Sequence, residues 1–395
     1  MEVVAAAAER EAAGDAVLHL EVGQPQSGAP AAAVAAATAL LAAGDPLGYT
    51  PACGIAPLRA RIASLYRERY DVAVDPARVI VTAGASAAVV LASLAAFDAG
   101  ATVAVAEPGY PCYRQILVAL GLRPLAVRVG HDDGYLLRAS HLDALAEPPA
   151  GVIVASPANP TGATYDAAAL DELQRWCDGH DVQLVADEIY HGITFGEAAP
   201  TACSARSIVI GSFSKYFSMT GWRLGWMIVP AELVEAADRL SQNLYLSPPT
   251  LAQHAALAAM HCSEELDAHV ARYAENRRVM TEALAAMGVR EVAPAGGAFY
   301  LYGDVSHWGI DSRELVDLWL NELGVAAAPG VDFDPVEGHR WMRWSLAGST
   351  ADITEAARRL VAWTSEARGR RCVTRWPGPA PATRPCPRRA RQAPG

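Results

Sequence analysis

Residues 207–230 read SIVIGSFSKYFSMTGWRLGWMIVP, and the only lysine of the chain, Lys215, lies between the two apolar runs of this stretch. The runs 207–215 and 225–230 contain β-branched residues without a clean polar alternation, which is typical of strands covered on both faces. Lysine and arginine together number 32, so 31 of them are arginine. Arginine keeps its proton, whereas a lysine amine can lose its proton and condense with a carbonyl. Codon bias toward arginine is one explanation for the single lysine, and a function that needs an amine is the other.

The same pattern of an apolar run, a turn and an Ala/Leu-rich stretch repeats from about residue 79. The earlier runs are VIVTAG (79–84), TVAVAEP (102–108), GVIVASP (151–157) and QLVADEIY (183–190). Helical stretches such as AAVVLASLAAF (87–97) lie between them. This alternation predicts an α/β fold with a largely parallel sheet between helices.

The pattern changes after about residue 265, where a long helical stretch leads into GGAFYLYGDV (296–305). We therefore predict a second, smaller α+β domain. The expected organisation is an N-terminal segment (1–45) joining the small domain, a large domain (46–270), the small domain (271–368) and a tail (369–395). The tail is rich in proline and arginine and has no apolar periodicity, so we expect it to be disordered.

Composition excludes several classes of protein. The formal net charge is −11, and residues 369–395 hold seven arginines and no acid, so the body is more acidic still. An acidic body repels phosphate backbones, and we expect no nucleic-acid partner. The seven cysteines include no C-x-x-C, which argues against a disulfide framework or a zinc site, and we expect no metal. Without a signal peptide or a convincing membrane span, we expect a cytoplasmic protein.

Polar groups follow five of the predicted strands. They are TAGAS, EPGYPCY, SPANPTG, DEIYH and SFSK, the last with Lys215. Because ligands of open α/β sheets bind outside the carboxyl ends of the strands, we expect these groups to meet in one site.

Three of these stretches, SPANPTG, DEIY and SFSKYFSMTGWRLGW, resemble the class I/II aminotransferases, which are pyridoxal-phosphate (PLP) enzymes of fold type I. The resemblance covers roughly residues 18–365. It implies a large domain with a mainly parallel seven-stranded sheet between helices, plus a smaller α+β domain. It also implies PLP as cofactor, an amino acid and a 2-oxo acid as substrates, and a homodimer with shared active sites.

The resemblance assigns Lys215 as the catalytic residue, which holds PLP through its amine and moves the α-proton. An amine that can become neutral is needed there, which arginine cannot supply. It assigns Asp187 as the residue that accepts a hydrogen bond from the pyridine nitrogen, because a nearby carboxylate favours the protonated ring.

Tyr190 and Asn159 are expected to donate hydrogen bonds to the phenolic oxygen of the cofactor, and Asn159 also to lie beside the substrate. The motif NPTG around Asn159 is on its own a good turn sequence. Glu188 is expected to be structural. His191 is expected to be structural too, with an approach to the active site as the alternative.

The resemblance implies that the cofactor phosphate binds at the turn after residue 82, where a helix begins, and at the loop around Lys215. Backbone N–H groups at a helix start and the planar fork of an arginine both suit phosphate. The residues expected to contact it are Gly84, Ala85, Ser86, Ser212, Ser214 and Arg223.

Tyr110 matches the aromatic residue that stacks on the cofactor ring, and Tyr113 is the alternative. Tyr49 matches a tyrosine that family members donate to the phosphate site of the neighbouring subunit, or it is an ordinary turn residue. Residues 243–250 resemble a loop at the same interface.

Arg343 matches the arginine that binds the substrate α-carboxylate, and Arg340 is the competing candidate. Gly23 matches a glycine whose backbone lines the substrate side. Gln24 and Ala158 depart from residues that are common in the family, and they weaken any assignment to a subfamily.

The function implied is ping-pong transamination between an L-amino acid and a 2-oxo acid. Another PLP reaction, such as β-elimination, decarboxylation or oxidation, is the alternative, because fold does not fix chemistry. A PLP-sensing transcription regulator would need a DNA-binding domain, and only 22 residues precede Gly23. The sequence does not indicate which amino acid is the donor.

Overall fold

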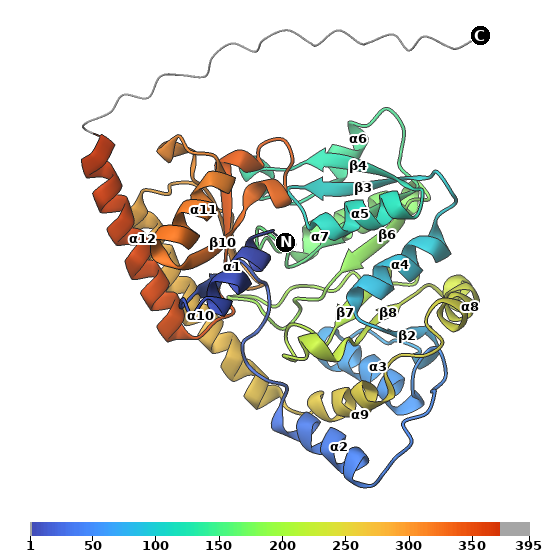
Figure 1. The fold of residues 1–395 in the computed structure, drawn as a ribbon. Coiled ribbons are helices and arrows are strands. Elements are labelled where there is room, and N and C mark those ends of the chain that lie inside the picture. The colour runs from blue at the N-terminus through green and yellow to red at the C-terminus, as the bar shows by residue number, and fades with distance from the viewer. Residues whose placement is uncertain (1, 372–395) are drawn as a thin grey trace, which may run out of the picture.

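A computed structural model describes the backbone of residues 2–371 and the side chains of residues 2–365. Its larger sheet has seven strands in the order β2-β8-β7-β6-β5-β3-β4 (Figure 1). The strands pair in parallel except β8, which is antiparallel to both neighbours. Their bounds are β2 (Val79–Thr82), β3 (Thr102–Glu107), β4 (Arg123–Arg128), β5 (Gly151–Ala155), β6 (Gln183–Asp187), β7 (Ile208–Ser212) and β8 (Gly225–Ile228).

The predicted α/β fold is confirmed, and six of these strands coincide with the apolar runs of the sequence. β4 was not among those runs. It lies at one edge of the sheet, and only Val127 of its residues RPLAVR is buried. A strand with so few buried residues needs no continuous apolar run, so the pattern used for the other strands does not detect it.

Alternate residues along the strands pack into two separate cores. In β2, Val79 and Val81 belong to one core and Ile80 to the other, as the two-residue period of a strand requires. One core is covered by α3 (Ala56–Tyr70), α7 (Ala167–Gly179) and α9 (Thr250–Ala259). The other is covered by α4 (Ala85–Ala96), α5 (Pro111–Ala119) and α8 (Val234–Leu244), and the short α6 (Ala139–Asp143) precedes β5. The helices therefore enclose both faces of the sheet.

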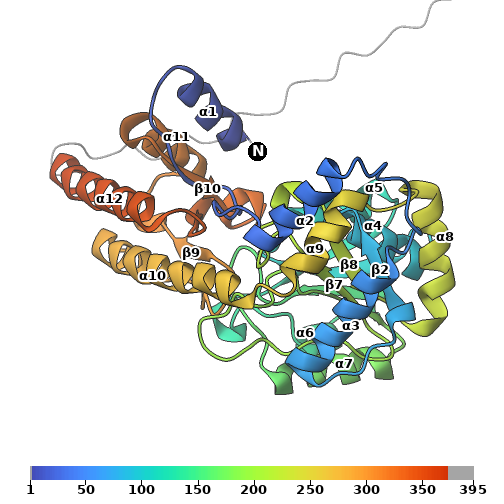
Figure 2. The ribbon, with the colours of Figure 1, turned by 90° about the horizontal axis from the view of Figure 1, so that it is seen from below.

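The smaller sheet has four strands in the order β1-β10-β11-β9. Its strands are β1 (Leu18–Leu20), β9 (Tyr300–Asp304), β10 (Val325–Pro329) and β11 (Trp341–Ser345), and β1 pairs in parallel with β10. The N-terminal segment thus contributes a strand to the smaller domain. Figure 2 shows this domain beside the larger one, with α1 (Glu2–Ala12), α10 (Ser263–Met287), α11 (Ser312–Leu323) and α12 (Thr350–Arg371).

Three helices bear on the predicted domain borders. α2 (Ala31–Ala42), within the segment 1–45, packs against α9 of the larger domain. α10 is continuous across residue 270. α12 runs to Arg371, three residues into the predicted tail, and residues 372–395 lie outside the described residues. Within residues 2–371, no helix has the length and apolar character needed to cross a membrane.

His19 in β1 provides a test of the small-domain packing. Its Nδ1 lies 2.8 Å from Glu21 Oε1, and its Nε2 lies 3.1 Å from Glu11 Oε1. The bond to Glu21 is the main cause that raises the pKa of His19 from 6.5 to about 9. A raised folded-state pKa stabilises the fold fully below the unfolded value and loses that effect as pH rises through the folded value.

We therefore expect the melting temperature to fall between pH 6.5 and about 9, and His19→Gln to flatten this part of the profile. Thermal unfolding at several pH values measures it. His261→Gln, at an exposed histidine, is the control and should leave the profile unchanged. A His19→Gln profile as steep as that of the wild type would contradict the assignment.

Candidate active site

Lys215 lies three residues beyond the end of β7, at the edge where the parallel strands of the larger sheet end. Its Nζ donates a hydrogen bond to the carbonyl oxygen of Gly23 at 2.6 Å. Burial lowers the pKa of the amine to about 8, the charge of Arg343 acts in the same direction, and Asp187 opposes it. Part of the amine is therefore neutral at mildly alkaline pH, and the neutral form is the one that attacks a carbonyl.

Asp187 is the last residue of β6, and its side chain is buried. The hydroxyl of Tyr113 donates to its Oδ2, and the backbone N–H of Ile189 donates to its Oδ1 at 3.1 Å. Burial raises the pKa of the carboxyl to about 6, and these two hydrogen bonds partly oppose the rise. The hydrogen bonds thus keep the carboxylate charged at neutral pH and hold it in one orientation.

Tyr110 and Tyr113, the two candidates for stacking on a cofactor ring, have different surroundings. Tyr113 is buried and donates its hydroxyl hydrogen to Asp187. Tyr110 is half-buried, and its ring is edge-on to that of Tyr113, with 5.5 Å between centroids. This arrangement favours Tyr110 as the stacking residue. The bond between Tyr113 and Asp187 was not predicted, because nothing in the sequence links two residues 74 positions apart.

Arg343 lies in the middle of β11 and is buried. Its Nη1 donates to Asn159 Oδ1 at 2.9 Å, its Nη2 donates to the carbonyl oxygen of Glu21, and its Nε has no partner. No carboxylate of the described part of the chain forms an ion pair with it. A buried cation without a counter-ion is costly, so this guanidinium is suited to bind an anionic ligand.

Two aromatic rings lie beside the Arg343 guanidinium. Its Cζ lies 4.4 Å from the ring centroid of Tyr300 and 4.6 Å from that of Phe333. The hydroxyl of Tyr300 is 2.7 Å from the hydroxyl of Tyr190, which is buried. Neither Tyr300 nor Phe333 was predicted for the site. The stretch GGAFYLY around Tyr300 indicated only a strand.

The start of α4 and the loop after β7 form a candidate anion-binding site. Gly84 precedes the helix with φ +86°, and a Cβ there would lie 2.5 Å from Nη2 of Arg223. Only glycine therefore lets the guanidinium approach the helix N-terminus. Arg223 is exposed and has no ion pair among the side chains described, those of residues 2–365, and the backbone N–H of Ser214 donates to Ser212 Oγ at 3.0 Å. A helix N-terminus beside an uncompensated cation fits a phosphate group.

Two other predicted residues lie away from this crevice. Tyr49 is 85% exposed, so it is not brought to the site of its own chain. Gly48, next to it, accepts a hydrogen bond from Thr250 Oγ1 at 2.7 Å, which holds the segment beside residues 243–250. Arg340 donates from Nη2 to Asp304 at 2.8 Å, so its charge is already paired with a carboxylate.

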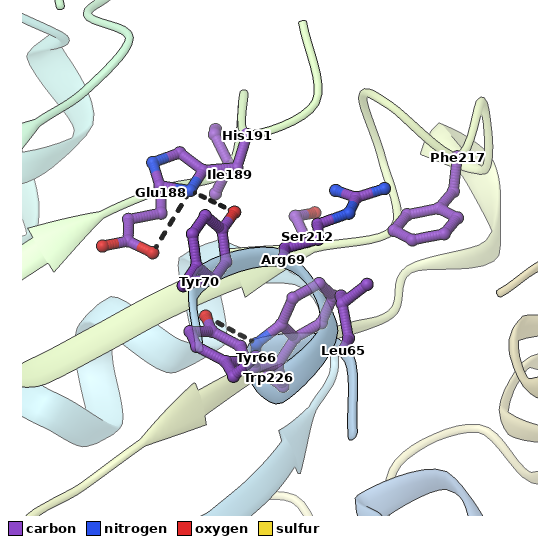
Figure 3. A pocket seen from close by; sticks show the side chains of 10 residues that line it. All are labelled: Leu65, Tyr66, Arg69, Tyr70, Glu188, Ile189, His191, Ser212, Phe217 and Trp226. Carbon is purple, nitrogen blue, oxygen red and sulfur yellow. Dashed lines mark hydrogen bonds and ion pairs between the residues drawn. The ribbon is translucent and has the colours of Figure 1, made fainter. Parts of the chain in front are cut away.

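Glu188 and His191 lie beside residues of α3 (Figure 3). His191 Nδ1 lies 2.7 Å from the Tyr70 hydroxyl and 3.4 Å from Glu188 Oε2, beside a small cavity. Burial lowers the pKa of His191 to about 3 and raises that of Glu188 to about 8. Glu188 accepts hydrogen bonds from the Thr201 hydroxyl and the Ala202 backbone. Both side chains therefore support the turn that carries Asp187 and Tyr190.

The family model of the class I and II aminotransferases matches residues 15–360. A valine–pyruvate aminotransferase of Mycobacterium tuberculosis is 44% identical over 369 residues, which are 92% of this chain and 95% of the relative. An arginine–pyruvate transaminase of Pseudomonas aeruginosa is 33% identical, covering 90% of this chain and 92% of the relative.

The crystal structure of an aminotransferase from Mycobacterium tuberculosis superposes with a TM-score of 0.90 at 44% identity, covering 93% of this chain and 96% of that one. This likeness confirms the fold type I architecture, in which a large and a small sheet lie on either side of the site. The chain belongs to the class I and II aminotransferase family, enzymes that transfer an amino group from an amino acid to a 2-oxo acid.

Proposed function

We propose that this aminotransferase binds PLP at Lys215 and works by a ping-pong mechanism, with the donor amino acid and the acceptor oxo acid using the same site in turn. One observation carries the proposal. The single lysine lies close enough to Arg223 and Arg343 for both charges to lower its pKa, and neither arginine has a carboxylate partner among the described side chains of residues 2–365. One uncompensated cation suits the phosphate of the cofactor and the other the α-carboxylate of the substrate.

The residues fit the cofactor at three further points. The helix start after Gly84 offers free N–H groups to a phosphate. Asp187, kept ionised by its hydrogen bonds, suits a protonated pyridine nitrogen. Tyr190 and Asn159 carry the hydrogen-bonding groups assigned to the phenolic oxygen.

When bound, PLP supplies a carbonyl that condenses with amines and a ring system that accepts the electron pair released at the substrate Cα. The protein orients the reactants. Arg343 binds the α-carboxylate through two N–H groups, which fixes the direction of the Cα–H bond relative to Lys215. With the cofactor and the donor bound, Lys215 Nζ would take the proton from the substrate Cα as a general base and return it as a general acid.

We further propose a neutral aliphatic amino acid as donor and pyruvate as acceptor, with valine as the first candidate. The name of the M. tuberculosis relative supports this choice. So do the charges beside Tyr110 and Phe333. Arg128 forms a bidentate pair with Asp334 at 2.7 and 2.8 Å, and Arg114 pairs with Glu107 at 3.2 Å. This chain therefore leaves no cation free there for a side-chain carboxylate.

A panel of amino acids tests the reaction and the donor together. We expect valine to remove the visible absorbance of the cofactor-loaded enzyme in a single turnover, and pyruvate to restore it. Aspartate and arginine should react far more slowly. Recovery of the absorbance without an oxo acid would indicate elimination in place of transamination, and a preference for aspartate would contradict the donor class.

We also propose a homodimer in which Tyr49 serves the phosphate site of the partner subunit. Its 85% exposure in one chain and the hydrogen bond from Thr250 to the adjacent Gly48, which joins this segment to residues 243–250, support an interface at this face. We expect the mass of a dimer in solution. Tyr49→Phe should weaken PLP binding about tenfold or more, as for a lost hydrogen bond to a charged group, in fluorescence titrations. A monomeric active enzyme would contradict the shared site.

The cytoplasm remains the proposed compartment. Cys53, Cys112, Cys177, Cys203 and Cys262 are free thiols, which fits a reducing environment.

A further inference from the structure

Tyr300, the first residue of β9, contacts three parts of the site and has no assigned role. Its side chain is 1% exposed, and its hydroxyl lies 2.7 Å from that of Tyr190. Its ring lies under the Arg343 guanidinium, with 4.4 Å from Cζ to the ring centroid. One side chain thus touches both the tyrosine assigned to the cofactor and the arginine assigned to the substrate.

Tyr300 also explains the glycine at position 23. A Cβ on Gly23 would lie 1.7 Å from the Tyr300 hydroxyl oxygen and 2.8 Å from Cζ of the same ring. The carbonyl oxygen of Gly23 is the acceptor of the Lys215 hydrogen bond. The Tyr300 hydroxyl therefore occupies the space where any side chain at position 23 would begin, next to the lysine's own partner.

The number of hydrogens decides the direction of the bond between the two tyrosines. Each hydroxyl can donate one hydrogen bond and can also accept. If Tyr190 gives its hydrogen to the phenolic oxygen of the cofactor, the hydrogen between the pair has to come from Tyr300. A hydroxyl that accepts one hydrogen bond is polarised and donates the other more strongly. Tyr300 would then strengthen the contact that Tyr190 makes with the cofactor.

We propose that Tyr300 is a positioning residue that acts on both halves of the site, through its hydroxyl on Tyr190 and through its ring on Arg343. This inference rests on the proposed PLP function. The hydroxyl donates to Tyr190 and directs the Tyr190 hydrogen toward the phenolic oxygen. The ring, together with that of Phe333, restricts the orientation of the Arg343 guanidinium and so favours the one in which it meets a carboxylate.

The first test is a pH titration of the visible absorbance of the cofactor-loaded enzyme without substrate. A hydrogen bond donated to the phenolic oxygen weakens the interaction of that oxygen with the proton of the neighbouring imine. Losing this donor therefore raises the pH of the titration midpoint. We expect Tyr190→Phe to raise the midpoint by about 1 pH unit and Tyr300→Phe by about 0.3 pH unit. The double variant should match Tyr190→Phe alone, because Tyr300 acts through Tyr190.

The charged and titratable groups that face the tyrosine pair stay unchanged in these variants. They are Lys215, whose Nζ lies 5.9 Å from the Tyr190 ring centroid, Arg343, Tyr110 and Tyr113. Tyr302→Phe is the matched control, because its hydroxyl, on the same strand and also buried, has no hydrogen-bond partner. Its midpoint should equal that of the wild type.

The second test separates the ring from the hydroxyl by steady-state kinetics. Tyr300→Phe keeps the ring and should leave the KM for the donor unchanged. Tyr300→Leu removes the cation–π contact and should raise this KM about tenfold or more. Melting temperatures of both variants show whether they fold.

The outcomes distinguish the inference from the function on which it rests. A wild type that titrates normally, with a Tyr300→Phe midpoint equal to its own, would overturn the action of the hydroxyl on Tyr190. Equal KM values for the folded Phe and Leu variants would overturn the action of the ring on Arg343. A wild type without any visible cofactor absorbance would overturn the proposed function itself, and the inference with it.

Discussion

Lys215→Arg is expected to lose nearly all transamination, by about 10⁴-fold or more, although it preserves the positive charge. The guanidinium stays protonated and has no amine to condense with a carbonyl or to accept the Cα proton. The visible absorbance of the bound cofactor should disappear with the activity. Turnover in both directions and an absorbance spectrum after incubation with PLP measure the two losses.

Lys215→Ala separates the amine from the space it occupies. It should be as inactive as Lys215→Arg, but an added small primary amine should restore part of its turnover, because the vacated space can admit a substitute base. The same amine should not rescue Lys215→Arg, whose side chain fills that space. Substantial turnover in Lys215→Arg without any addition would exclude covalent attachment at this residue.

Asp187→Asn is expected to lower turnover by about 10² to 10³-fold, the range for removing one preorganised electrostatic contact. The amide cannot balance the charge of a protonated ring nitrogen. It also leaves the Tyr113 hydroxyl with a weaker acceptor. Single-turnover rates with saturating donor measure the effect on chemistry apart from donor binding.

Glu188→Gln is the matched control for Asp187→Asn, because the two acids are adjacent in sequence and both are buried. Burial raises the pKa of Glu188 to about 8, so it is mostly protonated at neutral pH and glutamine differs little from it. Its amide oxygen can still accept from the Ala202 backbone N–H. Comparable losses in both variants would show that buried acids here act on folding and not on the cofactor.

Much of the fold follows from local sequence patterns. Strands such as β5 and β6 are short apolar runs that end in turn residues, and both lie inside the larger sheet. Such strands can be recognised in the sequence because both of their faces are buried and nearly all of their residues are therefore apolar. β4 was missed because only one of its residues is buried, so its sequence contains no such run. The packing of α2 on α9 was missed as well, because it depends on the larger domain being already folded.

The roles given to Lys215, Asp187 and Arg223 stay predictions, and they come from motifs in which the residues are neighbours in sequence. The bonds that join distant segments were not predictable. Tyr113 to Asp187 spans 74 positions and Tyr190 to Tyr300 spans 110, and no local pattern records either pair.

The sequence by itself determined the chemistry that is available and the family to which the chain belongs. A single lysine in SFSK, an acid in DEIY and an arginine eight residues beyond the lysine are properties of residue type and local order. The tertiary structure alone decided how candidates of the same type divide their roles. Arg340 is neutralised by Asp304, whereas Arg343 keeps its charge free, and His191 is turned toward Tyr70. Ion pairs and hydrogen bonds depend on distances of a few ångströms, and those distances exist only after the chain has folded.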